Sequence, residues 1–306
     1  MFYYLIYGLA VASDIEIEGA YRIEKTDQIQ VQIRQEQFEE TYLELSELEK
    51  SNEQVGVLTH YEDNWACLRF KKHGVFMIEN GTAIKYQLYD WHDNHFVSQI
   101  FLCYCMTVLL TQRKAMLIHG SAILYKGKTL IVSGDSGAGK SSLTNEIMSR
   151  GYMQMSDDIV AIGQDDKGMI AYPSFPVRKL CADFVEKHNM DKAELIPMPD
   201  VEREKYGLIL KDEYHNHEAL LGAMVIIKVG DVDEPVLEEI TGSVKLKYLT
   251  ENFFRQDVYE QVQLKPEEML RAIKVAGAMP IYVLKRPKDK MTVKQQADLI
   301  EKNIVI

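Results

Sequence analysis

One short motif constrains this chain more than any other feature of its sequence. Residues 134–141 read Gly-Asp-Ser-Gly-Ala-Gly-Lys-Ser, a complete G-x-x-x-x-G-K-S pattern. The apolar run 129–133 before it is typical of a buried strand, and we expect a helix over residues 140–150. A glycine-rich loop between a strand and a helix can surround an anion with backbone N–H groups, and the helix N-terminus adds positive potential. The sequence therefore predicts a phosphate-binding P-loop.

The residue types in this motif indicate separate roles. Lys140 would reach the β- and γ-phosphates of a nucleoside triphosphate, and the Ser141 hydroxyl would ligate Mg²⁺. The expected nucleotide-binding residues are Gly134, Asp135, Ser136, Gly137, Ala138, Gly139, Lys140, Ser141 and Ser142. The tetrapeptide 134–137 also matches the surroundings of a trypsin-like serine nucleophile. That enzyme class needs a β-barrel and an upstream His-Asp pair, so we favour the P-loop.

A nucleotide site also needs carboxylates, and Asp157 and Asp158 supply a pair just before the apolar run 159–162. Adjacent residues on a strand point to opposite faces, so we expect different jobs for them. One carboxylate can face Mg²⁺ while the other accepts the proton of an acceptor hydroxyl. A solvated turn is the alternative, as we expect for residues 165–166, and Asp231 is a second candidate metal ligand.

Other polar residues lie near the ends of apolar segments. We expect His119 to end the strand 116–118, and a hairpin through residues 125–127 would bring it beside the strand that leads into the P-loop. A lone histidine is usually structural, so the residues alone leave its role open. A transferring phosphoryl group needs cations beyond Lys140. The candidates are Arg178, Arg203, Lys205 and Arg255. The alternative for each of them is a solvent-exposed surface residue without a role in phosphate binding.

Composition excludes several classes of protein. The chain has 306 residues, 46% of them hydrophobic, and a net charge of −11, so it can bury a large core and repels polyanions such as nucleic acid. Residues 1–13 are apolar but lack the basic start of a signal peptide, and we expect a strand there. The run 96–110 is shorter than the roughly 18 residues that span a bilayer. We therefore expect a cytoplasmic protein without a membrane anchor, with reduced thiols at Cys67, Cys103, Cys105 and Cys181.

The pattern of apolar runs predicts two parts. Residues 1–90 contain short strand-like runs at 29–33, 67–70 and 75–78, interrupted by an acidic, helix-prone stretch at 35–49. A buried helix is expected over 90–113. Strands and helices then alternate to the end of the chain, as in α/β proteins. We therefore predict a β-rich N-terminal region over 1–90 and a P-loop catalytic domain over 91–306.

Four segments together resemble the catalytic domain of bacterial HPr kinase/phosphorylase. They are Leu-Ile-His-Gly at 117–120, the P-loop at 134–141, Arg-Gly at 150–151 and the aspartate pair at 157–158, and weaker similarity continues through 172–178, 249–255 and 280–287. The resemblance covers roughly residues 112–306. It implies a P-loop kinase core of the HPr-kinase type with a mixed sheet, and phosphorylation of a serine hydroxyl on a protein or peptide with ATP and Mg²⁺.

The resemblance also implies residue roles. By position, Asp157 matches the family's general base, Asp158 its metal-side acid and His119 its active-site histidine, while Arg178 and Arg255 fall in the weaker segments. Two departures are visible. Ser142 stands where the family has Glu, and the family's second glycine-rich signature is not recognisable between residues 160 and 203. In addition, residues 1–90 do not resemble the family's regulatory domain.

These departures fit the stand-alone members of the family better than the regulatory enzyme. Some of those members phosphorylate the C-terminal serine of lasso-peptide precursors, and their N-terminal β-rich part and catalytic segment are similar to the arrangement here. The leading expectation is therefore a peptide or small-protein serine substrate. An HPr-like protein kinase, a kinase of free serine and a P-loop nucleotide switch are the alternatives. The oligomeric state stays open, with a homo-oligomer among the possibilities.

Overall fold

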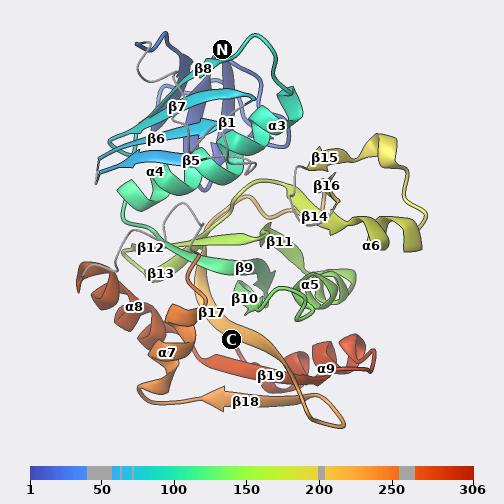
Figure 1. Cartoon of the computed structure of the whole chain (residues 1–306). Helices are drawn as coiled ribbons and strands as arrows, with labels where there is room; N and C mark the ends of the chain where they lie inside the picture. The colour runs from blue at the N-terminus through green and yellow to red at the C-terminus, as the bar shows by residue number, and fades with distance from the viewer. Residues whose placement is uncertain (40–56, 63, 71, 199–203, 255–265) are drawn as a thin grey trace. The chain divides into compact units, whose positions relative to one another are not determined.

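The computed structural model describes residues 1–39, 57–62, 64–70, 72–198, 204–254 and 266–306 (Figure 1). They form two compact units. Unit 1 contains Met1–Ala115 and Val177–Ile209, and unit 2 contains Met116–Pro176 and Leu210–Ile306. The first boundary follows Ala115, later in the chain than the expected one at residue 90, because the apolar helix expected over 90–113 packs on the sheet of unit 1.

An eight-stranded mixed sheet is the centre of unit 1, in the order β3-β1-β2-β4-β8-β7-β6-β5. Pairs β2–β4 and β4–β8 are parallel and the others are antiparallel. Its strands are β1 (Phe2–Ile6), β2 (Leu9–Ser13), β3 (Tyr21–Arg22), β4 (Val31–Gln35), β5 (Val57–Tyr61), β6 (Trp65–Phe70), β7 (Gly74–Glu79) and β8 (Ala83–Leu88). The prediction of a β-rich N-terminal region is confirmed, including strands within residues 1–13. Residues 40–49 of the expected acidic helix lie outside the described residues.

A continuous helical segment packs on this sheet. It comprises α3 (Asn94–Gln99), the π-helix η1 (Ile100–Cys105) and α4 (Met106–Gln112). The Phe101 ring meets Phe76 and Tyr86 edge-on, with ring centroids 5.3 Å apart in both pairs. By length and composition this 19-residue helix could cross a membrane, and it is longer than the apolar run suggests. Most of it is buried inside the molecule, as in the core helix of a globular protein.

The part of unit 1 formed by Val177–Ile209 is a small three-stranded sheet. Its order is β14-β16-β15, with β14 (Val177–Cys181), β15 (Ile196–Met198) and β16 (Lys205–Ile209). Helix α6 (Ala182–Lys187) and the short η2 (Lys192–Glu194) connect β14 to β15. A local apolar cluster of Leu180, Val185, Leu195 and Tyr206 supports them.

Unit 2 is built on a second mixed sheet, in the order β10-β9-β12-β13-β17-β19-β18, with β11 also paired to β9 and β10 also paired to β17. The strands β10, β17 and β19 are parallel, whereas β9 is antiparallel to β10 and β12. The strands are β9 (Met116–Tyr125), β10 (Lys128–Gly134), β11 (Met153–Ser156), β12 (Ile159–Asp165), β13 (Gly168–Tyr172), β17 (Ala219–Gly230), β18 (Val236–Ile240) and β19 (Ile281–Pro287). The α/β class with a mixed sheet is therefore confirmed.

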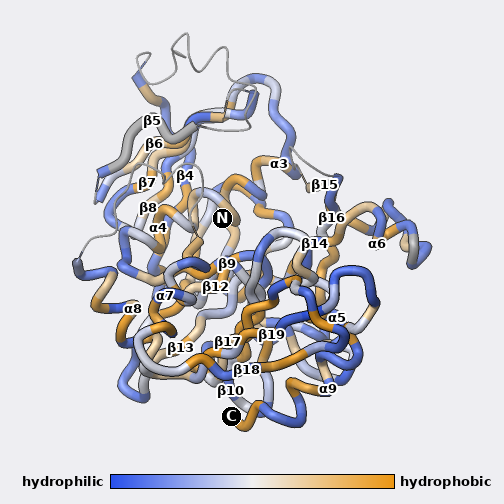
Figure 2. Tube along the Cα trace, turned by 60° about the horizontal axis from the view of Figure 1, so that its bottom comes forward, coloured by the Kyte–Doolittle hydropathy of each residue, from blue (hydrophilic) through white to orange (hydrophobic). Residues whose placement is uncertain are grey.

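Helices cover both faces of this sheet (Figure 1). Leu130 and Val132 of β10 pack with α5 (Lys140–Ser149) and α9 (Val293–Asn303), whereas Ile131 between them packs with α7 (Val244–Glu251) and α8 (Pro266–Ala278). This alternation is the period of a strand that is buried on both sides. Figure 2 shows the resulting apolar runs of β17 and β19 in orange. Among the described residues of unit 2, no Asp, Glu, Lys or Arg is buried, so its charged groups lie outside this core.

Candidate nucleotide-binding and catalytic site

The glycine-rich loop lies between β10 and α5, as predicted. Gly134 and Gly139 have φ angles of 141° and 110°, which a side chain would make unfavourable. A Cβ atom at Gly134 would also lie 2.5 Å from the Ile227 carbonyl oxygen, so the close approach of β10 to β17 requires glycine. The Ala138 N–H donates to the Asp135 carbonyl oxygen at 3.1 Å, which closes a turn within the loop.

Lys140 begins α5 and reaches back over the loop. Its Nζ lies 2.7 Å from the Gly134 carbonyl oxygen and 3.2 Å from that of Asp135. An ammonium group is thereby held at the loop, where the phosphates of a nucleotide would bind. Ser141 and Ser142 follow in the first turn and are exposed, so the Ser141 hydroxyl is accessible to a metal ion.

Strand β9 connects the P-loop to the aspartate pair. It pairs with β10 so that Gly120 is opposite Ser133, and with β12 so that His119 is opposite Ile159. A Cβ atom at Gly120 would lie 2.6 Å from the Val132 carbonyl oxygen, so this position must be glycine for β9 and β10 to pack. The predicted hairpin is confirmed: Lys126 and Gly127 form its turn, with φ angles of 48° and 85°.

Asp157 and Asp158 lie in the turn between β11 and β12. The Ser121 hydroxyl and the Asp158 N–H both donate to Asp157 Oδ1, at 2.8 and 3.1 Å. Asp158 has a φ angle of 70°, and its carbonyl oxygen accepts from the Gly120 N–H at 3.0 Å. The alternation of strand faces expected for this pair is therefore wrong, because Asp158 adopts a left-handed turn conformation. The two carboxylates instead contact His119 and Ser121, two positions apart on β9.

His119 lies inside β9 rather than at a strand end, because β9 continues to Tyr125. Its Nδ1 is 3.8 Å from Asp158 Oδ1, and its ring stacks on Phe254 with centroids 6.2 Å apart. The His119 N–H donates to the Asn252 carbonyl oxygen at 2.9 Å. The structure thus brings His119 and both aspartates together at the end of β10, which carries the P-loop.

The remaining predicted residues belong to other elements. Arg178 is on β14 and Lys205 on β16, both in unit 1, and Asp231 is exposed in the bend after β17. Arg203 and Arg255 lie outside the described residues. The phosphate-binding roles of these four basic residues stay predictions. The expected turn at residues 165–166 is confirmed by the pairing of Asp165 with Gly168 across the β12–β13 hairpin.

Two residues of the site were missed from the sequence. Ser121 follows Gly120 on β9, and its position two residues after His119 is the only signal that could have indicated it. Arg286 lies near the end of β19, and its Nε donates to the Ala138 carbonyl oxygen at 2.6 Å. The rule that selected Arg178, a cation beside an apolar segment, would also have selected Arg286.

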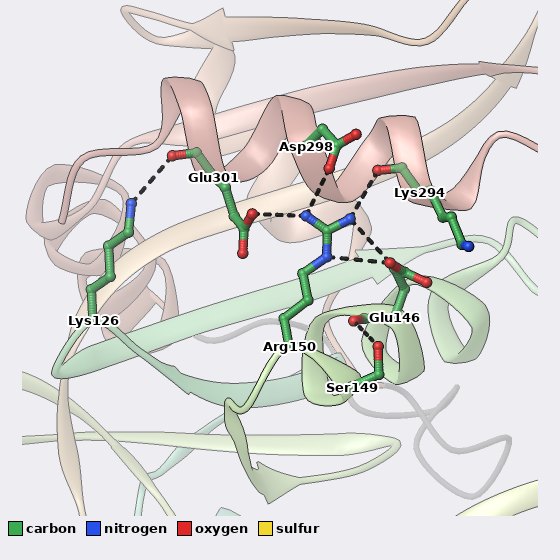
Figure 3. Close-up of polar contacts among 7 residues, drawn as sticks. All are labelled: Lys126, Glu146, Ser149, Arg150, Lys294, Asp298 and Glu301. Atoms are coloured by element: carbon green, nitrogen blue, oxygen red, sulfur yellow. Dashed lines mark hydrogen bonds and ion pairs between the residues drawn. The ribbon is translucent and has the colours of Figure 1, made fainter.

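The far end of α5 is fixed to α9 by Arg150 (Figure 3). Its guanidinium pairs with Glu146 of the same helical segment at 3.0 Å, and with Asp298 and Glu301 of α9 at 2.8 and 2.7 Å. It also donates to the Lys294 carbonyl oxygen at 3.2 Å. Since α5 begins at the P-loop, this ion-pair network holds the helix whose other end would face the phosphates.

Comparison with known proteins gives limited similarity. No protein-family model matches the chain. A 53-residue segment is 36% identical to a curated HPr kinase/phosphorylase from Geobacillus sp. (strain WCH70), and it spans 17% of this chain and 17% of that relative. A solved HPr(Ser) kinase/phosphatase from Coxiella burnetii aligns over 61% of this chain and 91% of its own, with 11% sequence identity and a TM-score of 0.29.

Proposed function

We propose that this protein is a Mg²⁺-dependent kinase that transfers the γ-phosphoryl group of ATP to a serine hydroxyl of a peptide or small protein. One observation carries the proposal. Strand β9 pairs with β10, which ends in the P-loop, and with β12, which follows the aspartate pair. The glycine-rich loop and a hydrogen-bonded carboxylate therefore lie at neighbouring strand ends. The 36% identity of one segment to an HPr kinase/phosphorylase supports the same activity.

The residues present could perform the transfer as follows. Backbone N–H groups of the loop hold the phosphates, and the Lys140 ammonium exchanges its carbonyl partners for phosphate oxygens. Asp157 accepts the proton of the serine hydroxyl, and the serine oxygen forms a bond to the γ-phosphorus. The bond from that phosphorus to the β–γ bridging oxygen breaks at the same time, and ADP leaves. The hydrogen bonds from Ser121 and the Asp158 N–H orient the Asp157 carboxylate.

The oxygen donors of the site suit Mg²⁺. This ion prefers hard oxygen ligands and usually takes one or two carboxylates together with nucleotide phosphates. The Ser141 hydroxyl and the Asp158 carboxylate are the proposed protein ligands, and the ion would neutralise charge on the phosphates. Within the described part of the chain, no group of three or more His, Cys, Asp or Glu side chains could hold a metal ion by itself.

For the acceptor, we propose the C-terminal serine of a peptide of the lasso-precursor type. The resemblance of the catalytic segment to stand-alone kinases of such precursors supports this choice. The chemistry at Asp157 requires only a hydroxyl, so it is shared with HPr-like protein substrates and with free serine. The acceptor must consequently be identified by comparing substrates directly.

The test uses the full chain with Mg²⁺, ATP and four acceptors, followed by mass spectrometry. The acceptors are a synthetic precursor peptide that ends in serine, its Ser-to-Ala form, a form with the serine moved to the interior, and free serine. Phosphorylation confined to the first supports the proposal in full. Phosphorylation of the internal serine or of free serine would overturn the acceptor but keep the kinase. ATP hydrolysis without transfer to any acceptor would contradict the kinase and favour a nucleotide switch.

A further inference from the structure

We infer that Arg286 is a positioning residue, which orients the peptide groups of the P-loop toward the nucleotide's phosphates. Its guanidinium donates from Nε to the Ala138 carbonyl oxygen at 2.6 Å, and from a terminal nitrogen to that of Gly137 at 3.3 Å. The other terminal nitrogen donates to the Pro287 carbonyl oxygen at 2.9 Å. The inference rests on the proposed nucleotide site and adds a residue to it that the P-loop motif does not contain.

The sheet register explains how a residue so far along the chain reaches the loop. Gly134 of β10 is opposite Ile227 of β17, and Ile227 is opposite Leu284 of β19. Because all three strands are parallel, Arg286 lies two residues beyond the level at which β10 ends and the loop begins. A Cβ atom at Gly139 would lie 3.4 Å from Arg286 Nε, so glycine there leaves room for the guanidinium.

The geometry of the peptide bond makes these contacts directional. In a trans peptide unit the C=O and the N–H of the following residue point to opposite sides. Holding the Gly137 and Ala138 carbonyls on Arg286 therefore turns the N–H groups of Ala138 and Gly139 away from it. The first of these already donates to the Asp135 carbonyl oxygen inside the loop. The planar guanidinium can hold two neighbouring carbonyls together, which a lysine ammonium matches poorly.

The same contacts distinguish this role from direct phosphate binding. Each nitrogen of the guanidinium already donates to a backbone carbonyl oxygen, so Arg286 acts through the loop. Loop N–H groups hold the α- and β-phosphates, which ADP and ATP share. The loss of Arg286 should therefore lower the affinity for both nucleotides by the same factor. The loss of a cation that contacts the γ-phosphate would instead lower the affinity for ATP alone.

The neighbouring residue provides a matched control. Lys285 Nζ pairs with Glu238 at 2.9 Å, so K285A removes a cation from the same strand without touching the loop. Isothermal titration calorimetry would measure the affinity of Mg·ADP and of a non-hydrolysable Mg·ATP analogue for the wild type, R286A, R286K and K285A. We expect R286A to weaken both nucleotides by a similar factor of about 10. R286K should also bind both nucleotides more weakly than the wild type does. K285A should bind both with wild-type affinity. The melting temperature of R286A should stay close to that of K285A.

The outcomes separate this inference from the proposed function. If the wild type binds neither nucleotide, the proposed function fails before Arg286 is tested. If the wild type binds both and R286A binds equally well, the inference is overturned. A loss confined to the ATP analogue would also overturn it, since that pattern indicates contact with the γ-phosphate. If R286A does not fold, R286K carries the test, and wild-type affinity in R286K would overturn the role of the paired carbonyl contacts.

Discussion

The two units provide examples of two different uses of polar side chains. In unit 1 they join the central helix to its sheet: Gln112 Nε2 donates to the Ile78 carbonyl oxygen at 3.0 Å, and Gln112 Oε1 accepts from the Gly81 N–H at 2.8 Å. In unit 2, Ser121 and Arg286 instead contact the aspartate pair and the P-loop. Polar groups of the first kind complete a packed layer, whereas those of the second kind set the geometry of a site.

This difference follows from how the sheets are covered. The sheet of unit 2 has apolar helices on both faces, which leaves the strand ends as the place for charged groups. Substitutions at those ends should alter activity with little loss of stability. Substitutions of polar groups that join one element to another should lower stability with little effect on activity. Substitutions of Asp157, Lys140, Arg150 and His73 test this contrast.

Asp157→Asn should have the largest effect on activity. Asparagine keeps the shape and can still accept a hydrogen bond from Ser121, but it cannot take up the proton of the acceptor. We expect phosphoryl transfer to fall by roughly 10² to 10⁴ with an unchanged melting temperature. Asp166→Asn, at the exposed tip of the β12–β13 hairpin, is the matched control. Full transfer activity in Asp157→Asn would exclude this carboxylate as the base.

Lys140→Ala should act on nucleotide binding. The ammonium held at the loop is removed, and we expect nucleotide affinity to fall by about 10- to 100-fold, the range for a charge-assisted hydrogen bond. Calorimetric titration measures the change. Lys128→Ala removes an exposed lysine from the other end of β10 and should bind normally. Equal affinities for the two variants would show that the loop is not the phosphate site.

Arg150→Ala should mainly lower the stability of unit 2. It removes the ion pairs between α5 and α9, and we expect a loss of about 1–2 kcal/mol in the free energy of unfolding. Nucleotide affinity should stay near the wild-type value. In Lys294→Ala the backbone carbonyl that contacts Arg150 remains, so its unfolding curve should match the wild type. A larger effect on nucleotide affinity than on stability would contradict the proposed difference between polar groups that join elements and polar groups that set the geometry of the site.

Protonation of His73 should make unit 1 less stable in mild acid. We expect this effect to be the smallest of the four. Burial lowers the pKa of His73 below 6.5, although Asp93 acts in the opposite direction and His92 and Lys72 add to the lowering. The unfolded chain therefore binds the proton first as the pH falls below about 6.5, which favours unfolding. Protonation also removes the acceptor for the Asp93 N–H at His73 Nδ1.

Urea unfolding between pH 7.5 and 5.5 measures this effect. His73→Gln should weaken the pH dependence, whereas His188→Gln, which replaces an exposed histidine of unit 1, should retain it. The same pH dependence in His73→Gln and the wild type would assign it to other groups.

The sequence was most informative where contacts are local. The P-loop, its strand and its helix lie within about 20 consecutive residues, and the hairpin turn at Lys126 and Gly127 follows from the residues at the turn itself. The position of His119 beside the strand that leads into the P-loop also needs only this hairpin. These features could be predicted because local geometry determines them.

The remaining features depend on pairing over long distances. The contact of Arg286 with Ala138 requires β17 to pair with both β10 and β19, which no local pattern indicates. The assignment of Val177–Ile209 to unit 1 depends on packing between segments far apart in the sequence, such as β15 against α3. The turn at Asp158 was missed for another reason. A positive φ is uncommon outside glycine, so strand alternation was the natural expectation for that residue.

A crystal structure with Mg²⁺ and a non-hydrolysable ATP analogue would show whether this loop holds ATP phosphates beside an aspartate base. We expect the β-phosphate within hydrogen-bonding distance of the loop's backbone nitrogens, with the Asp157 carboxylate facing the γ-phosphorus across the space for an acceptor hydroxyl. Nucleotide phosphates bound away from residues 134–141, or an Asp157 carboxylate turned away from the γ-phosphorus, would contradict it.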